Sequence, residues 1–264
     1  MKKYIRHGIV FLALVSFMIS GCEKETGYSL RSLNLKGNVK SVHEISYEPV
    51  VMFGQMTKGP RSKLLPDEVL HFFNEIGLKT ETRIIRPDGS YGRNVLEYDD
   101  NGKLFKGRMF LSENGRELLM YHYNYIHGES GKLIETVMHS IDGDSIFGRT
   151  VNIYGEHDRI IEEKRYGSGD TVVGRITFAY NEKGILETQI IYGQDNVPES
   201  TYNFDSDGHE QEMIIHQENS DDLKYYYIYE FDEKGNWTSR ITYFYQNGKE
   251  AANTITERRI VYYK

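Results

Sequence analysis

Tyr98-Asp99-Asp100-Asn101-Gly102-Lys103-Leu104, Tyr180-Asn181-Glu182-Lys183-Gly184-Ile185-Leu186 and Phe231-Asp232-Glu233-Lys234-Gly235-Asn236-Trp237 are three versions of one phrase. Each version has an aromatic residue four places before a glycine and a bulky apolar residue two places after it. The phrase returns about every 24 to 29 residues along most of the chain. Such a period indicates a tandem array of small structural repeats.

We take the turn residue of each phrase as its anchor: Gly77, Gly102, Gly131, Asp158, Gly184, Gly208 and Gly235. Asp158 stands for glycine in one copy, and Asp visits left-handed backbone more readily than most residues do. A second turn follows most copies, at Gly89, Gly115, Gly143, Gly169 and Gly248. The unit is therefore strand, turn, strand, turn, which is a β-hairpin.

Positions two, four and eight after the anchor are separated by even numbers, so the pattern predicts that they share one face of a strand. In the repeat of Gly102 these are Leu104, Lys106 and Phe110. The chain also contains 21 Tyr residues, which suit half-buried sheet surfaces. We predict an all-β fold in which tandem antiparallel hairpins form one extended, twisted and curved sheet.

The N-terminus has the pattern of a secretion signal. Lys2, Lys3 and Arg6 precede an apolar run, and small residues lead to Cys22, the only cysteine of the chain. The quartet ending at Cys22 resembles the lipobox of bacterial lipoproteins. The resemblance implies cleavage before Cys22 and its lipidation, with an ordinary signal peptide or a buried cysteine as the alternative.

The sequence predicts three regions: a signal peptide over 1–21, the lipidated Cys22 with a flexible tether over 22–34, and a repeat domain of about seven hairpins over 35–264. The repeat domain begins with a capping strand, and the aperiodic stretch 49–66 is predicted to be a loop. Removing 1–21 takes away three positive charges and changes the formal net charge from −7 to −10. An acidic protein is a poor partner for nucleic acid, so none is expected.

The three phrases quoted first resemble the YD repeats of RHS-type proteins. Together with the lipobox, they resemble repeat-bearing lipoproteins of Bacteroidetes bacteria, most of which have no assigned activity. The resemblance covers about residues 69 to 250 and is more specific for the repeat than for a function. It implies a bacterial envelope protein, anchored in the outer membrane and facing the periplasm or the exterior.

Two rows of tyrosines are candidates for ligand stacking or for core packing: Tyr121, Tyr123, Tyr125, Tyr225, Tyr227 and Tyr229. The turn Asp205-Ser206-Asp207-Gly208 resembles the start of a calcium loop but lacks its final Glu, because Ile214 stands there. Plain turn chemistry is the simpler interpretation. The histidines show no metal-ligand spacing, and the sequence has no nucleophile or phosphate-loop motif. We therefore expect no metal, no cofactor and no enzymatic activity.

The sequence favours a lipid-anchored, noncatalytic interaction or scaffold module of the cell envelope, with a protein or glycan partner. One alternative is a glycan-binding lipoprotein that uses the tyrosine rows. A further alternative, a hydrolase or an RHS-like toxin accessory, requires a cleft with clustered carboxylates or histidines.

Overall fold

A computed structural model describes residues 28–53, 55–62, 68–113, 115–246 and 248–264. The predicted signal peptide, Cys22 and the first part of the tether lie outside these residues. The strands are β1 (Val39–Met52), β2 (Gln55–Arg61), β3 (Glu68–Phe73), β4 (Lys79–Ile85), β5 (Tyr91–Tyr98), β6 (Leu104–Glu113), β7 (Arg116–His127), β8 (Leu133–His139), β9 (Ile146–Tyr154), β10 (Ile160–Tyr166), β11 (Val172–Tyr180), β12 (Leu186–Tyr192), β13 (Pro198–Phe204), β14 (Glu210–Ile215), β15 (Leu223–Phe231), β16 (Trp237–Gln246) and β17 (Lys249–Tyr262). Two 3-10 helices, η1 (Leu30–Leu33) and η2 (Glu156–Asp158), complete the described elements.

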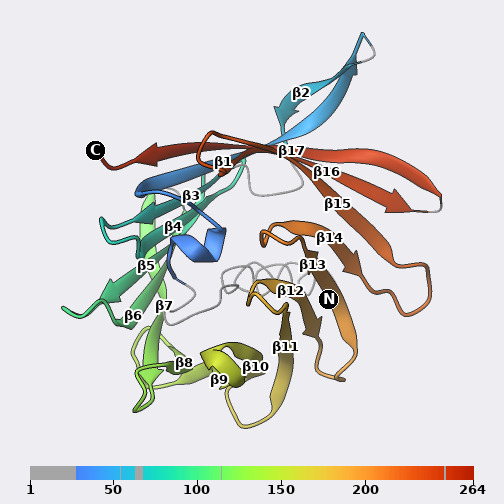
Figure 1. The fold of residues 1–264 in the computed structure, drawn as a ribbon. Helices are drawn as coiled ribbons and strands as arrows, with labels where there is room; N and C mark the ends of the chain where they lie inside the picture. Colours follow the sequence, from blue (N-terminus) through green and yellow to red (C-terminus); the bar gives the residue numbers. More distant parts are fainter. Residues whose placement is uncertain (1–27, 54, 63–67, 114, 247) are drawn as a thin grey trace.

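The strands close into an antiparallel barrel of 16 strands (Figure 1). From β3 to β17 each strand pairs with the next one in the chain, and β1 pairs with β3 on one side and with β17 on the other. β2 pairs only with the distal half of β1, so it stands outside the ring. The all-β, antiparallel prediction is confirmed, but the prediction of one extended sheet is wrong, because the sheet closes into a barrel. The twist of so many strands curls the sheet, and β1 then joins its two edges, leaving neither exposed.

The anchor turns lie where the sequence predicts them. The six anchor glycines have φ between 77° and 83°, and Asp158 has a φ of 62°. Because successive strands run in opposite directions, all the anchor turns lie at one end of the barrel, which we call the anchor end. The second set of turns lies at the opposite end.

Every anchor is followed by a β-bulge, which the sequence analysis missed. In the repeat of Gly102, Tyr98 pairs with Leu104 while Glu97 pairs with Lys106, so Phe105 is the extra residue. The same register shift follows the other six anchors. The prediction that positions two, four and eight share a face is therefore wrong. The extra residue changes the alternation, so position two points into the barrel while positions four and eight point outward.

In three repeats the aromatic residue is a tyrosine whose hydroxyl links its hairpin to the one before it. The hydroxyl of Tyr98 donates to the carbonyl of Lys79 at 2.7 Å, that of Tyr154 to Leu133 at 2.8 Å, and that of Tyr180 to Ile160 at 2.7 Å. Each acceptor is position two of the preceding repeat. The ring thus packs in the core while its hydroxyl pairs a backbone group, which explains why tyrosine occurs at this position.

Replacing Tyr180 by phenylalanine tests this link. The variant loses one hydrogen bond to the Ile160 carbonyl and keeps the ring, so its free energy of unfolding should fall by about 1 kcal/mol in urea denaturation. The matched control is Tyr245→Phe, because Tyr245 is exposed on β16. Equal stability of the two variants would contradict the proposed role of the hydroxyl.

Residues 28–38 run across the anchor end and pack against it; we call them the N-terminal segment. The carbonyl of Tyr28 accepts from the backbone nitrogen of Lys79, and the side chain of Asn236 pairs with both backbone groups of Lys36. Tyr28 and Leu35 are buried in two core clusters. The stretch 28–34, predicted as part of the flexible tether, is thus folded onto the barrel, because its apolar residues find partners inside the ring. The predicted capping strand is β1, which closes the barrel instead.

The stretch 49–66 is largely a hairpin and not the predicted loop. β1 continues to Met52, and β2 returns along it before the chain reaches residues 63–67, which lie outside the described part. Val51, Met52 and Phe53 at its tip are exposed. A hairpin that projects into solvent has no buried face, so its sequence shows no alternation for a pattern search to detect.

Candidate functional site

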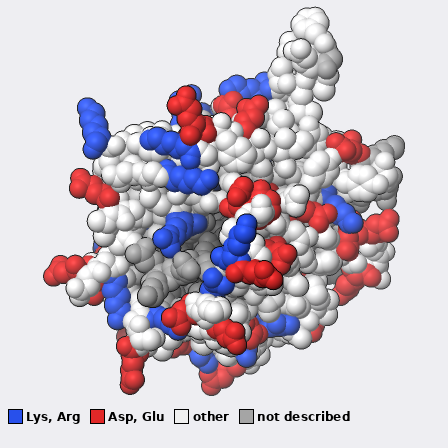
Figure 2. Space-filling model, in the orientation of Figure 1, with Lys and Arg blue, Asp and Glu red and all other residues white. Residues whose placement is uncertain are grey.

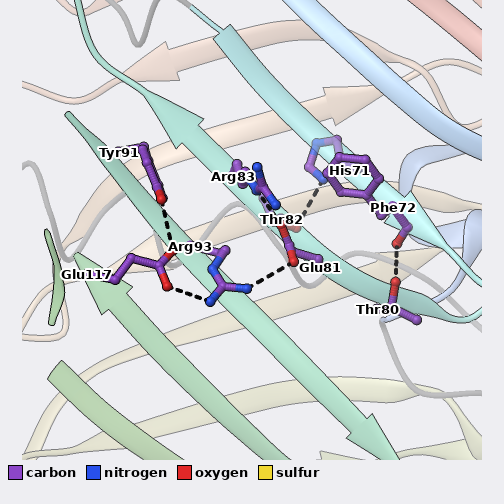
Figure 3. Close-up of polar contacts among 9 residues, drawn as sticks. All are labelled: His71, Phe72, Thr80, Glu81, Thr82, Arg83, Tyr91, Arg93 and Glu117. Carbon is purple, nitrogen blue, oxygen red and sulfur yellow. Dashed lines mark hydrogen bonds and ion pairs between the residues drawn. The ribbon is translucent and has the colours of Figure 1, made fainter. Parts of the chain in front are cut away.

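The outer face of the barrel carries a repeated set of paired charges. Figure 3 shows Arg93 of β5 between Glu81 of β4 and Glu117 of β7, with Nη2 2.7 Å from the Glu117 carboxylate. The Arg93 guanidinium also lies 4.7 Å from the centre of the Phe110 ring. Arg149 and Arg175 repeat this arrangement, each with a position-four glutamate and a position-eight tyrosine: Glu135 with Tyr166, and Glu162 with Tyr192. Each of these arginines thus has both a carboxylate and an aromatic ring as partners, which indicates a structural role.

The inner face has a different character, because it holds charged side chains away from solvent. Glu44 of β1 lies opposite Arg258 of β17, and its Oε1 accepts from Nε at 2.8 Å and lies 2.7 Å from Nη2. Burial by itself would raise the pKa of Glu44, but Arg258 holds that pKa below its usual value. The Arg258 guanidinium lies 3.4 Å from the centre of the Trp237 ring, so it is fixed between a carboxylate and an indole.

A second ion pair lies beside the first on β14 and β16. Nη1 of Arg240 is 3.3 Å from Oε2 of Glu210, and the guanidinium lies 5.0 Å from the Tyr227 ring. Burial raises the pKa of Glu210, although Arg240 opposes this effect. Arg240 also attracts the Glu44 carboxylate, and Arg258 attracts that of Glu210, so the two pairs form one cluster.

Lys79 of β4 completes this cluster. Its side chain is fully buried, and its Nζ has no hydrogen-bond partner. Burial lowers the pKa of Lys79 to about 8, with Glu44 favouring the charged form and Arg258 opposing it. We call Glu44, Lys79, Glu210, Arg240 and Arg258 the inner charged cluster.

Glu163 of β10 is a separate buried charge. It has no exposed surface, and neither carboxylate oxygen has a hydrogen-bond partner. Burial raises its pKa to about 7, and the nearby Arg165 reduces the shift. A buried carboxylate without partners is costly, so its presence calls for an explanation beyond stability.

Figure 2 shows the molecule as a space-filling view in the orientation of Figure 1. Lys, Arg, Asp and Glu side chains are spread over the whole of this face.

The six predicted tyrosines all belong to the inner face. Tyr121, Tyr123 and Tyr125 lie on β7, and burial raises the pKa of Tyr123 to about 12. Tyr225, Tyr227 and Tyr229 lie on β15, where Tyr229 is 5.8 Å from Trp237 between ring centres. The second row therefore adjoins the inner charged cluster, whereas the first packs beside Tyr28. Neither of the two predicted rows faces outward, and ligand stacking on them stays a prediction.

The calcium-loop-like turn and two of the histidines have local roles. Oδ1 of Asp205 accepts from the backbone nitrogens of Asp207 and His209, as a tight turn requires. His139 contacts the Asn124 side chain, and His216 lies 3.0 Å from Asp222. Within the described part of the chain, no group of three or more His, Cys, Asp or Glu residues has the arrangement of a metal site. None of the helices in that part combines the length and apolar character that a membrane span needs.

Sequence reasoning missed the inner charged cluster, although one signal was present. Position two is apolar in five repeats but is Lys79 and Glu210 in the other two. Position five, which the bulge turns inward, is Glu163 in one repeat and Arg240 in another. These exceptions to the repeat identify the inner charges once the bulge is known.

The fold and site together define the class of this protein: a closed antiparallel β-barrel with a charged, tyrosine-lined inner face. No family model matches the chain, and no curated protein matches it either. The predicted YD-repeat resemblance therefore rests on the turn phrases alone.

Several solved structures match the chain at low similarity. A porin-like protein from Bacteroides uniformis is 10% identical with a TM-score of 0.36, and the match covers 84% of this chain and 96% of that one. The TcdB2-TccC3-TEV structure is 16% identical with a TM-score of 0.32, covering 80% of this chain and 11% of that one. A DUF3836 family protein from Parabacteroides distasonis is 18% identical with a TM-score of 0.24, covering 39% and 90%. Likenesses this distant identify neither a family nor a function.

Proposed function

We propose that this protein is a lipid-anchored, noncatalytic binding module of a Bacteroidetes-type cell envelope, and that it holds a small ligand against the inner face of its barrel. The envelope location and the anchor are supported by the secretion signal and the lipobox-like quartet ending at Cys22. The inner face replaces the extended sheet surface as the expected working surface, because the sheet closes on itself.

The observation that carries the proposal is the set of buried polar atoms without partners on the inner face. Lys79 Nζ and both carboxylate oxygens of Glu163 are buried and unpaired. Each such group costs about 1 to 3 kcal/mol or more when it is charged. A barrel needed only as a scaffold would be more stable with apolar side chains there, so their retention supports a binding role.

A binding role fits the arrangement better than catalysis. The two carboxylates whose pKa burial raises, Glu163 and Glu210, lie on β10 and β14 and interact with different arginines. They do not form the acid pair that a hydrolase of the glycosidase kind uses. The two arginines of the inner charged cluster are fixed by carboxylates and rings, which suits the positioning of a ligand.

The single tryptophan gives a direct test of inner-face binding. Trp237 is the only Trp of the chain and touches Arg258, so its fluorescence reports on the inner charged cluster. Titration with fractionated small molecules from the envelope should change its emission in a saturable way. The control is a Trp237→Phe, Phe105→Trp variant, whose reporter stands at an exposed bulge on β6. A response from the outer reporter alone would refute binding at the inner face.

Lipid anchoring gives a separate prediction. Cys22 is six residues before the buried Tyr28, and six residues span at most about 20 Å. The lipid would therefore hold the anchor end close to the membrane. A Cys22→Ser variant should move from the membrane pellet to the soluble fraction, because multiple acyl chains provide the stable attachment. Continued pelleting of the variant would refute the anchor. In a separate experiment, protease treatment of intact cells would show which side of the outer membrane the wild-type protein faces.

A further inference from the structure

The inner charged cluster has more positive than negative charge. It contains three cations, Lys79, Arg240 and Arg258, but only two carboxylates, Glu44 and Glu210. Glu44 is the ion-pair partner of Arg258, and Glu210 is the ion-pair partner of Arg240. Lys79 therefore has no carboxylate of its own among the described residues, and one negative charge is missing.

The unpaired atoms in the cluster are all donors. Lys79 Nζ, Arg240 Nε and Arg258 Nη1 are buried and have no hydrogen-bond partner, whereas no carboxylate oxygen of Glu44 or Glu210 is in that condition. Lys79 is fully buried and Arg258 is only 8% exposed. Since unpaired buried donors are costly, the set is suited to a group that supplies acceptor oxygens and negative charge.

The donors are held in place before any ligand arrives. Trp237 lies against the Arg258 guanidinium at 3.4 Å, and Arg258 Nε donates to Oε1 of Glu44 while its Nη2 lies 2.7 Å from the same oxygen. The Arg240 guanidinium lies between the rings of Tyr227 at 5.0 Å and Trp237 at 5.3 Å. Side chains fixed in this way lose little entropy on binding, which favours recognition of an oxyanion by a planar fork of N–H groups.

We propose that the inner charged cluster is a binding site for an oxyanion, the carboxylate or phosphate group of a small-molecule ligand, with Lys79 as the cation that the ligand neutralises. This inference rests on the proposed function and names the chemical class of its ligand. The tyrosines of β15 lie beside the oxyanion site and would contact the uncharged part of the same ligand.

Titration of the full-length, detergent-solubilised protein tests the site, with Trp237 fluorescence as the readout at pH 7 and constant ionic strength. The probes are inorganic phosphate for the phosphate arm and glucuronate for the carboxylate arm, with glucose as the uncharged control. At least one anion should change the emission in a saturable way, and glucose should not. Whichever anion responds identifies the source of the oxyanion.

Lys79→Met separates recognition from folding. The variant should bind the responding anion about tenfold more weakly, because a charge-assisted hydrogen bond is lost. It should also unfold at the same or a higher temperature than the wild type without ligand, because an unpaired buried charge is removed. Lys103→Met, at an exposed anchor turn, is the matched control and should bind as the wild type does.

The outcomes distinguish the two proposals. If envelope small molecules change Trp237 emission but neither anion does, or if Lys79→Met leaves anion affinity unchanged, the oxyanion site is refuted and the inner-face binding function stands. If neither the anions nor the envelope fractions change the emission, both proposals fail. A Lys79→Met variant that melts well below the wild type would show that Lys79 has a structural partner, which also overturns the inference.

Discussion

Replacing Arg258 by methionine should lower the free energy of unfolding by about 3 to 5 kcal/mol, the effect expected when one partner of a buried ion pair is removed. Arg258 is the partner of Glu44 and lies against Trp237 inside the barrel. Without the guanidinium, the Glu44 carboxylate would stay buried opposite an apolar side chain. Urea denaturation at pH 7, followed by circular dichroism, measures the loss.

The double variant Glu44→Leu, Arg258→Met is the control for this prediction. It removes both charges, so most of the lost stability should return, because a buried ion pair and a well-packed apolar pair are often similarly stable. If the single variant loses less than about 1 kcal/mol, the pair behaves as an exposed one does and the barrel interior is more hydrated than its geometry indicates.

Glu163→Gln should have the opposite effect and should depend on pH. Burial raises the pKa of Glu163 from 4.5 to about 7. Between these values the folded protein keeps a proton that the unfolded chain has lost, so the stability of the wild type falls as the pH rises through this window. Above pH 7 the full penalty is present and amounts to about 3 kcal/mol. Glutamine has no such penalty.

The comparison is therefore made at two pH values. At pH 8 the Glu163→Gln variant should be about 3 kcal/mol more stable than the wild type, whereas near pH 4.5 the two should be nearly equal. Glu187→Gln, at an exposed bulge on β12, is the control and should show neither effect. A Glu163→Gln variant that is less stable at pH 8 would mean that the carboxylate is paired in solution.

The inner and outer faces differ in how their charged residues are paired. On the outer face, Arg93, Arg149 and Arg175 are each paired with a glutamate and a ring. On the inner face, Lys79 Nζ and both carboxylate oxygens of Glu163 have no hydrogen-bond partner. This contrast is why the binding role is assigned to the inner face.

The sequence predicted the hairpins and their turns because those features are local. A glycine with positive φ and an aromatic residue four places earlier can be recognised in a single repeat, as at Gly102 and Gly184. The closure of the sheet was not predictable in the same way. It depends on β1 pairing with β17, more than 200 residues away, and on a twist summed over every strand.

The inner site was missed for a related reason. One extra residue per hairpin, such as Phe105, reverses which side chains face inward, and a bulge leaves little trace in a hydrophobic pattern. Lys79, Glu163 and Arg240 were visible as exceptions to the repeat, but their positions on a common inner surface required the register of the whole ring. The ion pair between Glu44 and Arg258, which borders this surface, joins residues from opposite ends of the chain.

The closing pair of strands gives the most direct test of the barrel. His43 of β1 lies opposite Arg259 of β17, and the two strands meet only if the sheet closes. In a Cys22→Ser background, the double variant His43→Cys, Arg259→Cys should form an intramolecular disulfide under mild oxidation, seen as a mobility shift that reductant reverses. Arg108→Cys, Arg259→Cys, whose positions lie on β6 and β17, should stay reduced. An open sheet would leave the first pair reduced as well, and that result would contradict the closed barrel on which the inner site depends.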